Sequence, residues 1–318
     1  MAEHAAGGRD DDIFVYTGGE RVVPRDVTHV IVDKSVKIIR RRAFDPRRRL
    51  ASIEMHDGIE IIEEYAFFGC ISPGGSIKLP GVRVVERYAF ESTGLTDVEF
   101  GDKLETIGHS AFYNCRSLKS IKAPTVREID TFAFYRCDQL MDVEMPEVER
   151  IGDSAFSNCT RLRRIAIPLK NGIFDGVYVF YNCHNLSRVD VVGGIHKTIS
   201  SLHMESWRND MREEIARINR DLPTTNRTSS IRRWIRSVLQ RIEHYKTEHC
   251  MLLNEAMTLL ELALWKAKLL DEKETHFLGG KQASKRAKID DETARTELRI
   301  TSGASDVITN VLSFLVLE

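Results

Sequence analysis

The 318-residue chain is 42% hydrophobic and 29% charged, which is typical of a folded globular protein and excludes disorder throughout. Its 46 basic and 47 acidic residues leave a formal net charge of -1, so no global positive field attracts nucleic acid or an anionic membrane. No apolar run reaches the roughly 20 residues that a membrane-spanning helix needs, and the N-terminus resembles neither a secretory signal nor a transit peptide. We therefore expect a soluble protein in the cytoplasm.

The N-terminal segment has two parts. Residues 1–12, with the acidic run from Asp10 to Asp12, predict a disordered lead-in. Residues 13–35 predict an N-terminal capping turn. In this turn Val27, Val30 and Val32 match the strand half of the repeat that follows, without the other half.

Residues 36–200 contain a repeat in which an Ala-Phe pair, or Val-Phe in the last unit, recurs every 22–24 residues. The seven repeat phenylalanines are Phe44, Phe67, Phe90, Phe112, Phe134, Phe156 and Phe180. This period is typical of leucine-rich and related solenoids, in which one unit is one turn that cannot bury its apolar face alone. The repeat therefore organises the fold.

Apolar residues occupy fixed positions around each repeat phenylalanine. Ile, Val or Leu recurs eight and five residues before it, and a Leu and a β-branched residue recur about six and nine residues after it. Stacked in register, these positions form the ladders of a core. The segment from Ile107 to Phe112 and its equivalents have helical spacing, so we expect a short helical turn there with strands on either side.

The sequence of the repeat resembles that of a known family. The segment from Ile107 to Ile121 reads Ile-Gly-His-Ser-Ala-Phe-Tyr-Asn-Cys-Arg-Ser-Leu-Lys-Ser-Ile, and the segment from Ile151 to Ile165 repeats it almost word for word. It is similar to the BspA-type leucine-rich repeat family. The resemblance implies a binding or adhesion scaffold without catalysis. We predict an α/β fold, a right-handed leucine-rich repeat solenoid of about seven to eight turns, followed by an all-α C-terminal region.

Two exposed positions alternate in charge from unit to unit. One row runs Lys37, Glu60, Arg83, Glu105, Arg127 and Glu149, and the other runs Glu54, Lys78, Glu99, Lys122, Glu144, Ala166 and Asp190. Opposite charges on neighbouring strands stabilise a sheet by about 0.2–1 kcal/mol per pair. We interpret the rows as self-neutralising ladders that fix the order of the repeats. A charged ligand surface is the alternative.

Five of the six cysteines follow a repeat phenylalanine by three residues, namely Cys70, Cys115, Cys137, Cys159 and Cys183. Disulfides between neighbouring turns would lie within reach, but a chain without a secretory signal favours reduced thiols. The sequence has no Cys-x-x-Cys pair and no clustered histidines. We therefore predict buried apolar thiols and no metal.

Aromatic residues and an irregular segment form the candidate partner surface. Tyr113, Tyr135 and Tyr181 each follow a repeat phenylalanine, and Tyr is enriched in interface cores, although packing between units explains them as well. Residues 170–176 interrupt the repeat, because Asp175 stands where Ile is expected, and this segment contributes Phe174. These four aromatic residues are the predicted partner surface.

Residues 201–272 predict a helical region. Apolar residues from Met204 to Leu222 recur at steps of three or four, so a helix of about 18 residues should end before Pro223. A longer helix follows, capped by Ser230, with the alternating steps of four and three that coiled coils use. Its apolar stripe either packs against the solenoid end or the preceding helix, or mediates self-association.

The remaining C-terminal residues predict a polar linker and a short helix. Residues 273–300 form the linker, in which Lys285, Arg286 and Lys288 are a candidate nuclear import signal. Residues 301–318 predict an apolar helix that docks back onto the protein, because a bare apolar tail invites aggregation.

The sequence contains no Gly-rich phosphate loop, nucleophile elbow or metal-site helix, so we predict neither an enzyme nor a cofactor. We predict a non-catalytic protein-protein interaction scaffold whose protein partner is not identified. Two alternatives remain open. The chain could self-assemble into a homo-oligomer through the long helix, or it could act as a nuclear factor associated with nucleic acid through the basic linker, although the balanced charge argues against nucleic acid.

Overall fold

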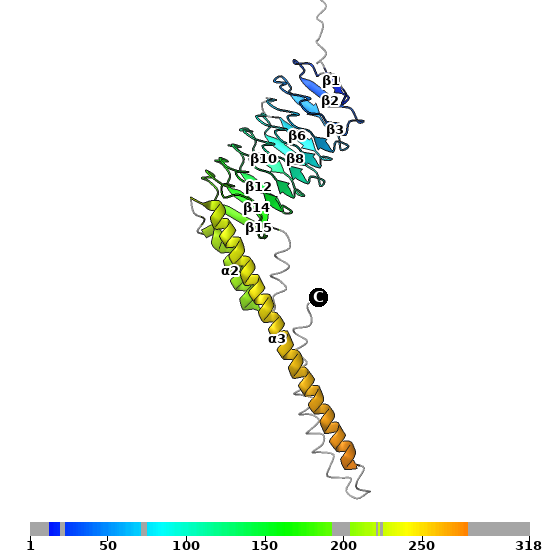
Figure 1. The fold of residues 1–318 in the computed structure, drawn as a ribbon, viewed down its shortest axis with the longest axis vertical. Helices are drawn as coiled ribbons and strands as arrows, with labels where there is room; N and C mark the ends of the chain where they lie inside the picture. The colour runs from blue at the N-terminus through cyan, green and yellow to red at the C-terminus, as the bar shows by residue number, and fades with distance from the viewer. Residues whose placement is uncertain are drawn as a thin grey trace, which may run out of the picture. The chain divides into compact units, whose positions relative to one another are not determined.

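The computed structural model describes residues 13–19, 23–70, 75–192, 204–220, 222 and 225–278, with side chains as far as residue 270. In this part of the chain a parallel β-solenoid precedes two α-helices (Figure 1). The chain divides into two compact units. The first combines Met1–His196 with Arg212–Leu239, and the second combines Lys197–Met211 with Gln240–Glu318. The predicted solenoid with a helical C-terminal region is confirmed.

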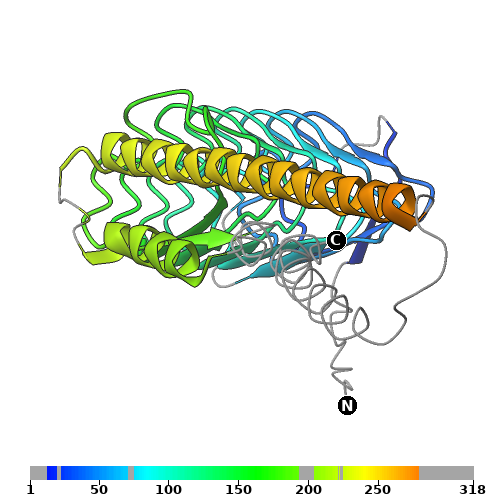
Figure 2. The same cartoon turned by 90° about the horizontal axis from the view of Figure 1, so that it is seen from below.

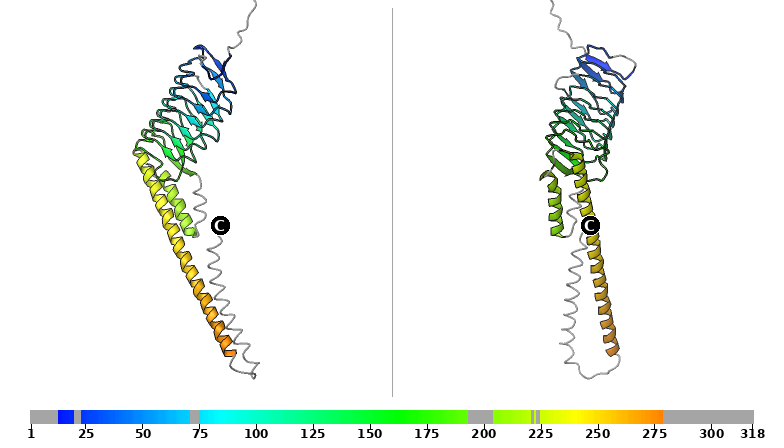
Figure 3. Two further views of the ribbon diagram at one scale, coloured as in Figure 1. Left: turned by 45° about the vertical axis from the view of Figure 1, so that its right-hand side comes forward. Right: turned by 60° about the vertical axis from the view of Figure 1, so that its left-hand side comes forward.

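The solenoid strands form three parallel sheets, whose members lie side by side along the coils (Figure 3). The first contains β1 (Ile13–Tyr16), β2 (His29–Val32) and β4 (Ser52–Glu54). The second contains β6 (Ser76–Leu79), β8 (Asp97–Phe100), β10 (Ser120–Lys122), β12 (Asp142–Glu144), β14 (Arg164–Pro168) and β15 (Arg188–Val192). The third contains β3 (Ile38–Ile39), β5 (Ile61–Ile62), β7 (Val84–Val85), β9 (Thr106–Ile107), β11 (Glu128–Ile129) and β13 (Arg150–Ile151).

The core is a set of ladders that run through the stacked coils, which nest one behind another in Figure 2. All seven repeat phenylalanines are buried. The rings of neighbouring phenylalanines stack nearly parallel, with centroids 4.9–5.9 Å apart. The Ile and Val residues eight and five positions before them are buried as well. The predicted core is therefore confirmed in these positions.

The expected helical turn before each phenylalanine is wrong. Ile107 ends a two-residue strand, and consecutive turns follow it. Ser110 has a left-handed φ of 54°, which a right-handed helix excludes. The Phe112 N–H donates to the Ala133 carbonyl of the next coil at 2.8 Å, so bonds between coils alternate with the bonds of single turns and no continuous helical ladder forms. The spacing of Ile, Ala and Phe in this segment resembles that of a helix, but it belongs to a corner of the solenoid.

A break between two sheets lies where the second unit departs from the repeat. Strand β4 ends the first sheet and β6 begins the second, although the two strands belong to successive coils. In this unit Ser72-Pro73-Gly74-Gly75 replaces the usual Leu of the repeat, and residues 71–74 lie outside the described residues. The third sheet continues past this point, since β5 pairs with both β3 and β7. The departure from the repeat in this unit therefore coincides with a break in one sheet only.

The helical region contains α2 (Glu205–Arg220) and α3 (Arg227–Leu278). Helix α3 begins three residues before Ser230, so the predicted cap is wrong; Ser230 lies in the first turn, where its N–H donates to the Asn226 carbonyl at 3.0 Å. The helix also continues past the predicted end at residue 272, because no Gly or Pro occurs before Gly279. Within the described ranges, neither helix combines the length and the apolar character that crossing a bilayer requires.

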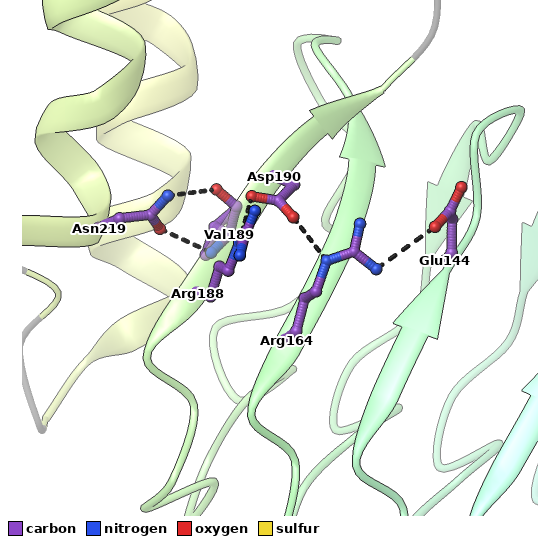
Figure 4. A network of polar contacts seen from close by, with 6 residues as sticks. All are labelled: Glu144, Arg164, Arg188, Val189, Asp190 and Asn219. Atoms are coloured by element: carbon purple, nitrogen blue, oxygen red, sulfur yellow. Dashed lines mark hydrogen bonds and ion pairs between the residues drawn. The ribbon is translucent and has the colours of Figure 1, made fainter.

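Polar side chains from the helices cover the C-terminal end of the solenoid. The Asn219 amide donates to the Val189 carbonyl at 3.1 Å and accepts from the Val189 N–H at 2.7 Å, as a further strand would (Figure 4). Arg227 donates to the carbonyls of Leu186 and His184 at 3.2 and 3.0 Å. Of the two predicted uses of the helical stripe, its first part therefore packs on the solenoid end and on the preceding helix: Arg232 donates to the Phe174 carbonyl at 2.9 Å, and the Trp234 indole donates to the Glu214 carbonyl of α2 at 3.0 Å. The apolar residues of this part, Ile231, Trp234, Ile235 and Val238, are buried.

Candidate functional site

The first row of alternating charges forms pairs along the coils. Lys37 lies 3.6 Å from Glu60, Arg83 lies 3.2 Å from Glu105, and Arg127 lies 3.8 Å from Glu149. Of these residues, Arg83, Glu105, Arg127 and Glu149 also line a recess of about 680 Å³. Arg83 and Arg127 in this recess are paired with Glu105 and Glu149, so the charges of the row neutralise one another. The interpretation as a self-neutralising ladder agrees with this geometry.

The second row is completed by an arginine that sequence reasoning missed. Ala166 interrupts the alternation, but Arg164 from the same strand reaches Glu144 at 3.3 Å and Asp190 at 2.5 Å (Figure 4). Arg188 adds a contact with Asp190 at 2.9 Å. Burial tends to raise the pKa of Asp190, but the hydrogen bonds from the two arginines outweigh it and lower the pKa. The row is therefore neutralised across its irregular coil.

The repeat cysteines are reduced and buried, as predicted. Each thiol lies within 3.3 Å of the carbonyl oxygen of the repeat phenylalanine in the preceding coil and donates to it. Burial raises the pKa of Cys70 and of Cys115 to about 11. No cluster of potential metal ligands occurs among the residues that the structure describes. The cysteine ladder therefore has a structural role.

The predicted partner surface is only partly brought together. The rings of Tyr113 and Tyr135 stack with centroids 5.0 Å apart, and both side chains are half-buried. Tyr181 is exposed, but the buried Ser157 occupies the equivalent position in the coil between it and Tyr135. Phe174 does not contribute to an exposed surface. Its side chain is only 5% exposed, and its ring packs against the Phe180 ring with the centroids 5.6 Å apart. Lys285, Arg286 and Lys288 lie outside the described residues.

A repeated turn at one corner of the solenoid sets two rows of side chains next to each other. In each coil the residue after the repeat phenylalanine donates its N–H to the carbonyl of the residue two before the phenylalanine, at 3.0–3.2 Å. Both positions therefore project from the same corner in every coil. In the second to fifth coils, the row before the phenylalanine contains Tyr65, Tyr88, Ser110 and Phe132, and the row after it contains Phe68, Glu91, Tyr113 and Tyr135.

The aromatic side chains of these rows touch in an unbroken series. Tyr65 contacts the edge of Phe68 at 5.7 Å and stacks on Tyr88 at 4.9 Å. His109 joins Tyr88 to Phe132, with ring centroids 5.4 and 5.9 Å apart. The rings of Phe132 and Tyr135 then meet at 5.5 Å. We call this surface the aromatic patch, defined by Tyr65, Phe68, Tyr88, Glu91, His109, Tyr113, Phe132 and Tyr135.

Three aromatic residues of the aromatic patch have an unfavourable backbone conformation. Tyr65, Tyr88 and Phe132 each have a φ of 58°, in the left-handed region that bulky residues avoid. Ser110 and Ser154 occupy the equivalent position in other coils at 54° and 56°, so the turn itself does not need an aromatic ring. Left-handed residues other than Gly persist at a cost of about 1–3 kcal/mol and gather at functional sites. This strain marks the corner as a candidate site.

Glu91 lies between Phe68 and Tyr113 in the row that follows the phenylalanines. It shares their turn, since its N–H donates to the Tyr88 carbonyl at 3.2 Å, and its side chain is half-buried. Burial is the cause that raises the pKa of its carboxyl group. No hydrogen bond or ion pair reaches this carboxylate from the part of the chain that the structure describes.

The sequence contains a signal for most of the aromatic patch. Only tyrosines directly after the phenylalanine were predicted, which overlooks Phe68 in the same row. Aromatic residues two positions before the phenylalanine recur in three of four successive coils, so that row could have been found by the same alignment. The sequence could not have shown that the two rows share a corner, because this depends on the conformation of the turn.

The comparisons with known proteins assign the family. A family model described as the BspA type leucine rich repeat region matches residues 25–83 and 83–206, in six copies. These ranges include more than half of the 318 residues. The chain belongs to the BspA-type leucine-rich repeat family. This BspA-type repeat supports a protein-interaction scaffold in general terms.

Solved structures similar to this BspA-type chain come from bacteria. A leucine-rich repeat protein from Bacteroides ovatus has 20% identity over 57% of this chain and 63% of that chain, with a TM-score of 0.41. A leucine rich cell surface protein from Faecalibacterium prausnitzii has 22% identity over 52% and 60%, with a TM-score of 0.35. The chain thus spans less than two thirds of either protein. No match was found among curated proteins.

Proposed function

We propose that this BspA-type protein is a non-catalytic scaffold that binds a protein partner through the aromatic patch. The observation that carries the proposal is the unbroken series of half-buried rings from Phe68 to Tyr113, held across four coils. Aromatic side chains are enriched in the cores of protein interfaces and among residues that dominate binding energy.

The solenoid supports such an interface because it holds the rings in place before binding. The corner is fixed by backbone hydrogen bonds between coils, for example from Tyr88 N–H to the His109 carbonyl at 3.0 Å. Beneath it lies the stack of buried phenylalanines. A surface that is already ordered loses little conformational freedom when a partner binds, so more of the contact energy contributes to affinity.

The test replaces the strained aromatic residues with the residue that other coils use. A variant with Tyr65→Ser, Tyr88→Ser and Phe132→Ser should fold, because Ser110 and Ser154 have the same left-handed backbone. Affinity capture after crosslinking in the native cell should recover the partner with wild-type protein and at least ten-fold less with the variant, since the loss of a single aromatic residue that contributes about 1.4 kcal/mol already weakens binding about ten-fold.

A matched control changes three exposed residues of the second charge row, Lys78→Ser, Glu99→Ser and Lys122→Ser. The control should recover the partner as wild-type protein does. Circular dichroism and thermal unfolding should show that both variants are folded. Equal recovery by the aromatic variant and by wild-type protein, or equal losses in both variants, would contradict the proposal.

A further inference from the structure

The aromatic patch has one acidic member, Glu91, which lies between two aromatic residues of the same row. The ring contacts run from Phe68 through Tyr65, Tyr88, His109, Phe132 and Tyr135 to Tyr113. Phe68 and Tyr113, at the two ends of this series, occupy the coils on either side of Glu91 in the same row. Glu91 therefore occupies the row position between the two ends of the aromatic series.

The coil spacing places Glu91 within reach of both ends of the series. The core phenylalanines of its own coil and of the two adjacent coils stack with centroids 5.0 Å apart. The Gly69 N–H donates to the Glu91 carbonyl at 2.9 Å, and the Ser92 N–H donates to the Tyr113 carbonyl at 2.9 Å, so the three coils keep this register at the corner. Side chains that leave equivalent turns at this spacing are neighbours.

Two arginines near this corner are already paired with other carboxylates. Arg87 lies 2.8 Å from Glu64, and Arg42 lies 3.7 Å from Asp45. The carboxylate of Glu91 has no such partner in the described part of the chain, and its half-buried position removes part of its hydration. A partner that supplies a positive charge would therefore relieve an unfavourable arrangement, whereas one that supplies a negative charge would worsen it.

The aromatic rings beside Glu91 also favour a positively charged ligand. The face of an aromatic ring carries a negative quadrupole, so an ammonium or guanidinium group is attracted to it. The chain itself contains one example in this surface: the Arg42 guanidinium lies over the Tyr65 ring, 5.3 Å from its centroid. An arginine side chain can combine planar stacking on rings with hydrogen bonds to a carboxylate, and lysine can supply the charge alone.

We propose that the aromatic patch binds an arginine or lysine side chain of a partner protein, with Glu91 as the counter-ion and Tyr88 and Tyr113 as the flanking rings. The partner is thus a segment that presents a cationic side chain to this corner. This inference rests on the proposed function, because it names the chemistry of the partner at the same surface.

The experiment uses the full chain and a defined set of probes. Three five-residue peptides with blocked ends carry Arg, Lys or citrulline between Gly and Ser residues; citrulline has the shape of arginine without its charge. Nuclear magnetic resonance titration with each peptide should give saturable shifts for Arg and Lys and at least ten-fold weaker binding for citrulline. Equal binding of Arg and citrulline, or no binding of any peptide at millimolar concentration, would overturn the inference.

Two variants locate the binding. Glu91→Gln keeps the size of the side chain and should weaken binding of the Arg peptide at least ten-fold, and Tyr88→Ser should also weaken it while the fold is kept. Glu99→Gln, an exposed carboxylate of the second charge row, is the matched control and should bind the peptide as wild-type protein does. Unchanged binding by Glu91→Gln would overturn the role of this carboxylate.

Two further outcomes separate this inference from the proposed function. If Glu91→Gln still captures the cellular partner while the triple Ser variant does not, the scaffold function stands and the cationic ligand is rejected. If the Arg peptide binds only after Lys285, Arg286 and Lys288 are changed to Gln, the chain's own basic segment is the occupant, and the inference of a separate partner is overturned.

Discussion

Single side chains complete the backbone hydrogen bonding between coils. Five thiols donate to carbonyl oxygens of the preceding coil. Where the first unit lacks the cysteine, Arg47 is 6% exposed and donates to the Val23 carbonyl through Nε at 2.9 Å. In the third unit Thr93 occupies the cysteine position, and its hydroxyl lies 3.2 Å from the Cys115 thiol. The five thiols and Arg47 thus supply donors to carbonyls that would otherwise be buried without one, which would destabilise the fold.

The raised pKa of the Cys115 thiol predicts a loss of stability at alkaline pH. Its pKa is about 11 in the folded protein, compared with 9.0 for an ordinary thiol. As the pH rises from about 9 to about 11, the unfolded chain loses this proton first, so the free energy of unfolding should fall. For one thiol the fall should be on the order of 1–3 kcal/mol. Below about pH 8 the contribution should be constant.

Urea unfolding of wild-type protein and Cys115→Ala at pH 8 and pH 10 would measure this effect. The Ala variant should be less stable at pH 8 because it leaves a cavity and an unpaired carbonyl. It should lose less of its remaining stability between the two pH values than wild-type protein loses. Equal losses in the two proteins would show that this thiol does not titrate as described.

At the scale of elements, the helices end the solenoid by providing what the next coil would have provided. Arg232 donates to the carbonyls of Phe174 and Gly176 at 2.9 and 2.7 Å, and Thr228 accepts from the Phe180 N–H at 3.0 Å. Together with Asn219 and Arg227, these residues pair backbone groups of the last coil. A bare end would leave strand edges free to pair with another chain.

Arg227→Met should destabilise the first compact unit. Arg227 is 5% exposed and burial lowers its pKa, so it is held by its carbonyl partners in a dehydrated site. Loss of hydrogen bonds from a charged donor, with buried carbonyls left unpaired, should reduce the free energy of unfolding by about 2–3 kcal/mol. Arg233→Met, an exposed change on the same helix, is the control and should have little effect in the same urea titration. A stability change of the same size in both variants would contradict this role.

At the scale of the whole molecule, the two compact units differ in how well they bury apolar side chains. The first contains the phenylalanine stack and the buried start of α3. In the second, Met251, Leu262, Leu264 and Trp265 are 57–66% exposed. Exposed apolar side chains gathered along one helix are typical of surfaces that bind another protein. We therefore propose that this part of α3 self-associates.

Sedimentation velocity would test the association. Wild-type protein should sediment as a dimer or larger species at micromolar concentration, and a variant with Leu264→Ser and Trp265→Ser should remain monomeric, because it removes the largest exposed apolar area. Lys266→Ser and Lys268→Ser together provide a control on the same helix and should leave the association unchanged. A wild-type protein that is monomeric at all concentrations would rule out this assembly.

The repeat shows how far local pattern predicts this fold. The period, the ladders of Ile, Val and Phe, the thiols and the first charge row all follow from residues at fixed offsets, because each coil places the same offset in the same environment. The same reasoning failed for Phe174, since the interruption near Asp175 changes which side chains face inward. It also failed for the segment before Phe112, where a corner and a helical turn share one apolar spacing.

The sequence by itself determined the solenoid, its number of turns and its family, because stacking identical units leaves one way to bury their apolar residues. Only the tertiary structure decided that Tyr88 and Tyr113 belong to one surface with Glu91 between the rings of neighbouring coils. It likewise decided that Arg164 completes the second charge row. These relations depend on left-handed turns and on register between coils, which bring together side chains from different positions of neighbouring repeats.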